Sequence, residues 1–185
     1  MATMNSGLGG SAGYGENSFQ TNGVDTGNLD DGAIQVDVTS VFGAGGVDFF
    51  GSSYTDVWIN SNGLITFDSA NTSYQPSGIG GLNQPAIAPF WSDIDITKGG
   101  DIYWDLDPGA GTLTVTWLDV RPYDSNNSST NSFQMVLTDT GDGNFSVEFI
   151  YEDIDWAYGG TGSGGGPATA GGPGGGSNDV GGGGS

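Results

Sequence analysis

The sequence predicts an all-β protein, folded as an antiparallel β-sandwich or as a partly open barrel of meander hairpins, with a Gly-rich C-terminal tail. Several segments alternate apolar and polar residues with a period of two, which is the pattern of a half-buried antiparallel strand. Turn-forming Gly, Asn and Asp residues separate these segments. No segment repeats apolar residues with the period of an amphipathic helix. The 185 residues are enough for one domain with a core of its own.

The N-terminal part of the chain is rich in Gly, Ser and Asn and has few apolar anchors. We expect residues 1–28 to form a flexible arm that contains at most one short strand. The β domain itself is expected over residues 29–156, and it begins with a turn in the Asp- and Gly-containing segment 28–32.

The first strands of the domain lead into its most regular hairpin. Residues 33–41 alternate in polarity, and residues 54–61 and 64–68 flank the dipeptide Asn62-Gly63. This dipeptide readily adopts the two positive φ values of a type I′ turn. We therefore predict a two-residue hairpin turn with Val57 and Ile59 on the buried face.

Residues 85–95 place two prolines, two isoleucines, a Phe-Trp pair and two aspartates within eleven positions. Apolar bulk leads directly into acid, so the segment needs a core on one side and water or a cation on the other. We expect its apolar residues to form the inner half and Asp93 and Asp95 to emerge at the rim.

Four further strands are predicted as a meander because each alternates β-branched or aromatic residues with polar ones. They cover residues 101–106, 112–118, 133–137 and 145–151. Trp104 and Trp117 lie in phase with the apolar stripes, so we expect both to be buried. Trp58 lies on the opposite side from Val57 and Ile59, and it is the candidate surface aromatic that could stack on a sugar.

The composition changes beyond Trp156. From Gly159 onward, 15 of the 27 residues are Gly, and such a segment cannot bury enough apolar surface to offset its ordering entropy. We expect residues 157–185 to be a linker, or a strand-donating segment held by its own domain or by a neighbouring molecule.

The charge balance excludes several classes of partner. Lys98 and Arg121 are the only basic side chains against 22 acidic ones, which gives a formal charge of −20. Nucleic-acid binding requires basic side chains on the phosphates, and an anionic membrane would repel this chain. No apolar run approaches membrane-spanning length. We expect neither nucleic-acid binding nor membrane insertion.

The chain contains no Cys and no His, which excludes disulfides and the usual structural zinc ligands. A bacterial or archaeal exported protein fits this composition better than a eukaryotic secreted one. Residues 1–10 contain neither the basic nor the apolar region of a signal peptide. We therefore expect either a leader that was removed or an export route that reads the other end of the protein.

Paired aspartates suggest a calcium site. Asp93 with Asp95, and Asp105 with Asp107, are spaced so that both carboxylates of a pair would leave the same face of an extended strand, about 6–7 Å apart. Calcium takes six to eight oxygen ligands, which paired Asp and loop carbonyls could supply. The alternative is that each pair is simply solvated at a strand end. Asp93 and Asp95 are the first candidates, because the Pro-rich segment before them would fix their position.

Catalysis is not expected. Without His or Cys, the usual Ser, Cys and zinc hydrolase arrangements are missing. Two carboxylates can hydrolyse glycosides, and Glu148, Glu152 and Asp93 are conceivable candidates, but nothing in the sequence marks one of them as an acid with a raised pKa. We predict no catalytic residue and no cofactor other than calcium.

The predicted strands contain blocks that resemble the nidogen-like (NIDO) extracellular domain. The blocks, in chain order, are VWINSNGLITF (57–67), AIAPFWSDID (86–95), LTVTW (113–117), NSFQMVL (131–137) and FIYEDIDW (149–156). The upstream DDG (30–32) and VDFFG (47–51) resemble the bacterial type, which is often attached to secreted adhesins and calcium-binding repeat proteins. Members of the family usually end in a Leu-Pro-Gly-Ser-like strand, whereas this chain has residues 177–180 followed by Gly, which leaves open whether it closes its own sheet.

The resemblance implies a secreted, non-catalytic module of adhesion or matrix at the cell surface or outside the cell. Its implied partners are an extracellular protein or polysaccharide, or copies of itself. Two alternatives stay open: a self-assembling structural subunit of a filament or matrix, and a carbohydrate-binding or glycan-acting domain.

Overall fold

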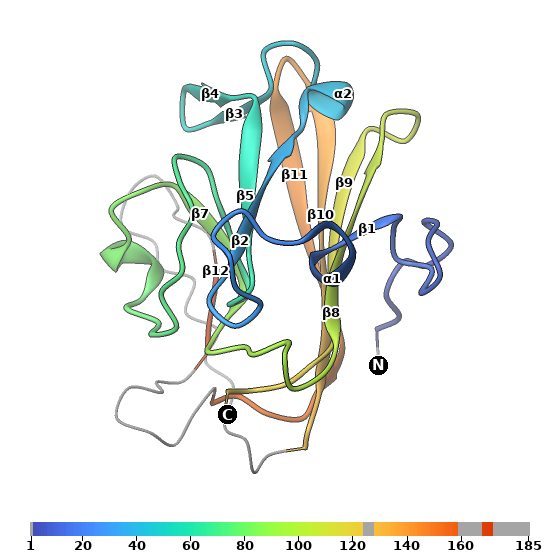
Figure 1. The fold of residues 1–185 in the computed structure, drawn as a ribbon. Helices are drawn as coiled ribbons and strands as arrows, with labels where there is room; N and C mark the ends of the chain where they lie inside the picture. The colour runs from blue at the N-terminus through green and yellow to red at the C-terminus, as the bar shows by residue number, and fades with distance from the viewer. Residues whose placement is uncertain (1, 124–127, 159–167, 172–185) are drawn as a thin grey trace.

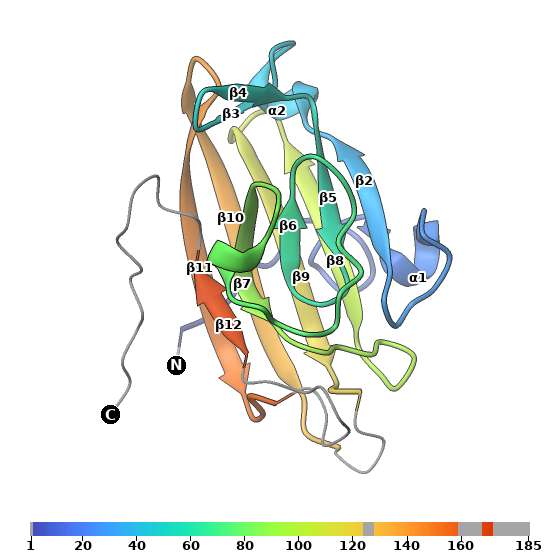
Figure 2. The ribbon, with the colours of Figure 1, turned by 90° about the vertical axis from the view of Figure 1, so that its left-hand side faces the viewer.

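The computed structural model describes residues 2–123, 128–158 and 168–171, and over these residues two antiparallel five-stranded sheets pack as a sandwich (Figures 1 and 2). The all-β prediction is confirmed, and the described sheets do not close into a barrel. The first sheet has the order β1 (Asn17–Ser18), β8 (Asp101–Asp107), β9 (Thr112–Val120), β10 (Asn131–Gly141) and β11 (Asn144–Ile154). The second has the order β12 (Thr169–Gly171), β7 (Ala86–Trp91), β6 (Leu64–Thr66), β5 (Asp56–Asn60) and β2 (Ala33–Asp37).

Short elements complete the described fold. A two-stranded sheet pairs β3 (Val47–Phe49) with β4 (Ser52–Tyr54). The helices are α1 (Phe19–Asn22), α2 (Thr39–Phe42) and the 3₁₀ turn η1 (Ile79–Gly81). Helix α2 occupies the end of the segment 33–41, which was predicted to be strand throughout. None of the described helices has the length and hydrophobicity needed to cross a membrane.

The core lies between the two sheets. The predicted stripes of β9 and β10 are fully buried, and so is the predicted face of β5. Within this core, the rings of Trp117 and Phe133 stack with centroids 5.0 Å apart. Trp104 and Trp117 are both buried, as their phase predicted. The stripe of β11 is only partly covered, and Val147 is exposed, because β11 is the edge strand of its sheet.

The N-terminal segment covers the outer face of the first sheet. Met4 is buried against Val136 and Ile150. The Asn5 N–H donates to Oε1 of Gln134 (2.9 Å), and Nε2 of Gln134 donates back to the Asn5 carbonyl (3.0 Å). Farther along, β1 pairs with β8, and Phe19 is fully buried. The segment expected to be a flexible arm is therefore packed at several points along its length.

The Gly-rich tail supplies a strand to its own sheet. β12 pairs with the edge of β7 in antiparallel register, with Thr169 opposite Trp91 and Gly171 opposite Ala88. The rest of the tail, residues 159–167 and 172–185, lies outside the described residues, and so do residues 177–180, where the family signature differs.

The hairpin between β5 and β6 forms as predicted, but its turn is of a different type. Asn60 pairs with Leu64, so the turn has three residues, and among them only Gly63 has a positive φ, at 78°. This is the pattern of a type I turn followed by a left-handed residue. The two-residue type I′ prediction was wrong because Asn62, which had to adopt a positive φ, is instead held by side-chain bonds to neighbouring loops.

Gly63 provides a test of this packing. A Cβ at this position would lie 1.9 Å from the Phe90 carbonyl oxygen, in a left-handed backbone conformation. We expect Gly63→Ala to lower the free energy of unfolding by about 2–4 kcal/mol, measured by urea denaturation. Gly45→Ala is the control, because a Cβ at Gly45 meets no atom within 4 Å; it should change stability by less than about 1 kcal/mol. Equal effects of the two changes would contradict the described turn.

Candidate functional site

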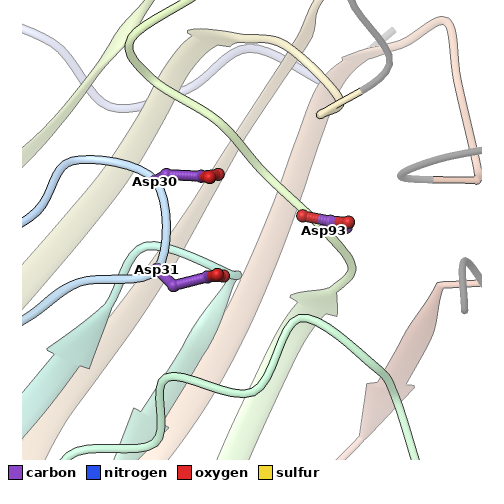
Figure 3. Close-up of side chains that lie close together, drawn as sticks. All are labelled: Asp30, Asp31 and Asp93. Atoms are coloured by element: carbon purple, nitrogen blue, oxygen red, sulfur yellow. The ribbon is translucent and has the colours of Figure 1, made fainter. Parts of the chain in front are cut away.

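Three aspartates from distant parts of the chain meet at one end of the second sheet. Asp30 and Asp31 lie in the loop before β2, and Asp93 lies just after β7 (Figure 3). One carboxylate oxygen from each residue lies within 4.8 Å of the others. Within the described residues, this is the one group of three or more such side chains close enough to share a metal ion.

The loop that carries Asp30 and Asp31 is held through its backbone. Oδ1 of Asn28 accepts hydrogen bonds from the N–H groups of both aspartates. The Ser61 hydroxyl donates to the Asp30 carbonyl and accepts from the Gly32 N–H (3.0 Å), and the Ser61 N–H donates to the Gly32 carbonyl (2.8 Å). These bonds fix the loop while leaving most of the carboxylate oxygens free.

Asn62 connects the two chain segments that carry the aspartates. Its Nδ2 donates to Oδ1 of Asp31 (2.8 Å), and its Oδ1 accepts from the N–H of Ile94 (2.8 Å). Asn62 is fully buried, so water does not compete for these bonds. The side chain therefore sets the spacing between the loop before β2 and the segment after β7.

Asp93 lies in a short segment that crosses from the second sheet to the first. Ile94 forms an isolated bridge with Pro122, the Tyr123 N–H donates to the Asp93 carbonyl (3.1 Å), and the Asp95 N–H donates to the Arg121 carbonyl (3.0 Å). Asp93 is only 7% exposed. The predicted rim residue is therefore inside the protein.

The surroundings of Asp93 and Asp30 disfavour the charged forms of these two carboxyl groups. Burial, followed by repulsion from Asp31, Asp30 and Asp95, raises the pKa of Asp93 to about 7. Burial, followed by repulsion from Asp95 and Asp31, raises the pKa of Asp30 to about 6. Lys98 acts in the opposite direction on both groups, but its effect is the smallest. Oδ1 of Asp30 is buried and accepts no hydrogen bond from any described residue.

Asp95, which was predicted to share an ion with Asp93, has other partners. Its Oδ2 forms an ion pair with Nζ of Lys98, and its Oδ1 accepts from the N–H of Thr97 (2.9 Å). Asp95 is buried, its negative charge is paired with the positive charge of Lys98, and it lies outside the group of three.

Asp105 and Asp107, the second predicted pair, also lie apart from the group. Oδ1 of Asp107 accepts from the N–H groups of Gly109 (2.8 Å) and Ala110 (3.0 Å), which fixes the turn between β8 and β9. Burial, followed by repulsion from Asp107 and Glu16, raises the pKa of Asp105. Of the four predicted metal ligands, the group contains only Asp93.

Sequence reasoning did not identify Asp30 and Asp31 as ligands. Their motif, Asp30-Asp31-Gly32, was noted only as a turn and as part of the family resemblance. Two adjacent acids in a chain with two basic residues were the available signal, but nothing in the local pattern points to Asp93.

An open depression of about 940 Å³ borders the site. Its walls are mainly polar, and they include Asn28, Asp31, Asn71 and Tyr74. Trp58, the predicted surface aromatic, lies elsewhere, on β5, opposite Gln35 and Thr66, and it is half-buried.

Comparisons with known proteins place these features in a family. The family model described as NIDO related matches residues 15–179. Dendrite extension defective protein 1 of Caenorhabditis elegans is 31% identical over 61% of this chain and 12% of its own length. Mouse alpha-tectorin is 32% identical over 65% of this chain and 7% of its own length. Nidogen of Drosophila melanogaster is 28% identical over 62% of this chain and 10% of its own length.

The chain thus spans about a tenth of the length of these relatives. No solved structure matches the chain. The family match covers most of the sequence, including every strand of the sandwich and all three aspartates. The chain belongs to the NIDO-related family.

Proposed function

We propose that this domain is a secreted, non-catalytic module of extracellular matrix or cell-surface adhesion. The observation that carries the proposal is the family match over residues 15–179. Nidogen and alpha-tectorin are extracellular matrix proteins, and the same role is proposed for this chain. The likeness covers a domain and not the whole relative, so the proposed role is that of one module.

The charge of the domain defines the chemistry of its partner. With 22 acidic and two basic side chains, and with Lys98 already paired to Asp95, the surface has little capacity to bind anions. A basic protein surface, or a polysaccharide bound through hydrogen bonds, fits this surface better.

The buried position of the aspartates favours a non-catalytic role. A carboxyl with a raised pKa is the usual sign of a general acid, and Asp93 and Asp30 both have one. However, a glycosidic bond must reach the acid, and Asp93 is only 7% exposed. Glu148, another conceivable acid, is exposed on β11 and is not enclosed by a site.

A binding screen tests the adhesion role. The intact chain is immobilised and exposed to matrix proteins, neutral and charged polysaccharides, and cell surfaces. We expect saturable binding to at least one of them, because the domain presents polar loops around the open depression. Immobilised polyaspartate is the control, since it reproduces the charge without the fold. Equal binding to polyaspartate, or no binding to the chain at all, would contradict the proposal.

The second candidate is a self-assembling structural subunit, and the pairing of β12 favours it. This strand has three residues and two registered pairs with β7. A strand so short, joined through a Gly-rich segment, could pair equally with β7 of a neighbouring molecule, as in donor-strand complementation.

Removal of the tail separates the two candidates. If the chain assembles through β12, the intact protein should form oligomers that grow with concentration, and a variant lacking residues 159–185 should not. Size-exclusion chromatography with light scattering, together with electron microscopy, measures the difference. A monomer in both cases dismisses assembly and leaves the adhesion module.

The proposal of a bacterial source rests on the DDG and VDFFG motifs and on the absence of Cys, whereas the relatives named above come from animals.

Carbohydrate binding is the weaker alternative. It would occur in the depression beside Asp31, which the half-exposed Tyr74 also lines.

A further inference from the structure

We infer that Asp30, Asp31 and Asp93 form a calcium-binding site that ties the loop before β2 to the segment after β7. The site differs from the pairs expected from sequence spacing, and it stands independently of the adhesion role, because its evidence is geometric. Three features of the site favour calcium: the spacing of the oxygens, a buried carboxylate oxygen without a hydrogen bond, and the shortage of other cations.

The spacing suits calcium. Calcium–oxygen distances are about 2.3–2.6 Å, so two ligand oxygens on opposite sides of the ion are about 4.8 Å apart. The three aspartate oxygens lie within 4.8 Å of one another, and Figure 3 shows the Asp30 and Asp31 side chains extending toward Asp93. Magnesium requires shorter bonds and near-ideal octahedral geometry. Zinc prefers His and Cys, and the chain has neither.

The site also contains a buried carboxylate oxygen that has no hydrogen-bond partner among the described residues. Asp93 as a residue is more than nine-tenths buried, and the hydrogen bond that it accepts from a described residue, the Tyr123 N–H, goes to its backbone carbonyl. Oδ1 of Asp30 is buried and accepts no hydrogen bond from any described residue. An unpaired buried carboxylate is costly, and a divalent cation between these groups removes that cost.

No basic side chain is placed to do this instead. The sequence has two. Nζ of Lys98 pairs with Asp95 and lies over the Tyr123 ring, 5.1 Å from its centroid. Arg121 is not among the charges that shift the pKa of Asp30 or Asp93. The protein therefore gathers three acids, while the ion pair of Lys98 is made with the neighbouring Asp95 and its effect on the pKa values of Asp30 and Asp93 is the smallest of those acting on them.

The surroundings can complete the coordination shell. Three carboxylates supply three to six of the six to eight oxygens that calcium requires. Asp31 lines the open depression, so water can reach the ion from that side. The Asn62 amide is occupied by Asp31 and the Ile94 N–H, so its role is to position the ligands.

The test is thermal unfolding of the intact chain, first in EDTA and then with calcium added to about 10 mM, which exceeds the Kd of about 10⁻³ M of weak calcium modules. We expect the Tm of the wild type to rise with calcium concentration, since only the folded state has the site. The same concentration of magnesium should raise it much less.

Asp93→Asn is the decisive variant. Its Tm should not respond to calcium, and in EDTA at pH 7.5 it should melt at or above the wild type, because the change removes an unpaired buried charge. This second expectation distinguishes loss of a ligand from loss of the fold. Asp107→Asn is the matched control: it removes one aspartate charge outside the group and should keep the full calcium response.

Isothermal titration in about 0.15 M salt, where diffuse surface attraction is screened, should give one calcium per wild-type chain and none for Asp93→Asn. A wild-type Tm that is unchanged by calcium overturns the site. So does a calcium response that Asp93→Asn retains in full, since this would show that the ion acts on the general negative charge.

Discussion

The structure depends on a polar turn, residues 60–62, that is buried and cannot reach water. Asn60, Ser61 and Asn62 are all fully buried, so each of their polar groups must find a partner inside the protein. The Asn60 side chain bonds to Leu64, Thr66 and Asn71. The Ser61 carbonyl accepts from the Trp117 indole of the opposite sheet (3.3 Å). Satisfying this one turn therefore fixes the position of both sheets and of three loops.

The same turn brings the acids together. Ser61 and Asn62 hold the loop before β2 on one side and the N–H of Ile94 on the other. Asp30, Asp31 and Asp93 are attached to these held segments, so their carboxylates converge although the charges repel. The hydrophobic core and the polar turn thus offset the electrostatic cost of bringing these carboxylates together. The same cost raises the pKa values of Asp93 and Asp30.

The strands could be predicted from the sequence because alternation is a local property. The stripe of Leu113, Val115 and Trp117 requires only its own neighbours to be recognised. The group of aspartates could not, since 62 residues separate Asp31 from Asp93 and only tertiary contacts unite them. The two-residue spacing of Asp93 and Asp95 predicted a shared ion, but this prediction was misleading for a local reason. Lys98, three residues after Asp95, forms an ion pair with the Asp95 carboxylate, which therefore does not belong to the group of three. Buried Met4 was likewise invisible, because a single apolar residue among Gly and Ser has no periodicity.

The two terminal strands have a mechanical consequence. β1 lies at the edge of one sheet and β12 at the edge of the other, and each has two registered pairs with its neighbour. Tension drawn along the chain would first load the contacts of Met4 and Asn5 with the first sheet at one end and the β12 ladder at the other, and then the β1 ladder. On the N-terminal side, the fully buried ring of Phe19 would then stop the unzipping. The domain can thus lengthen under force by detaching its terminal strands, while its core and the polar turn remain folded.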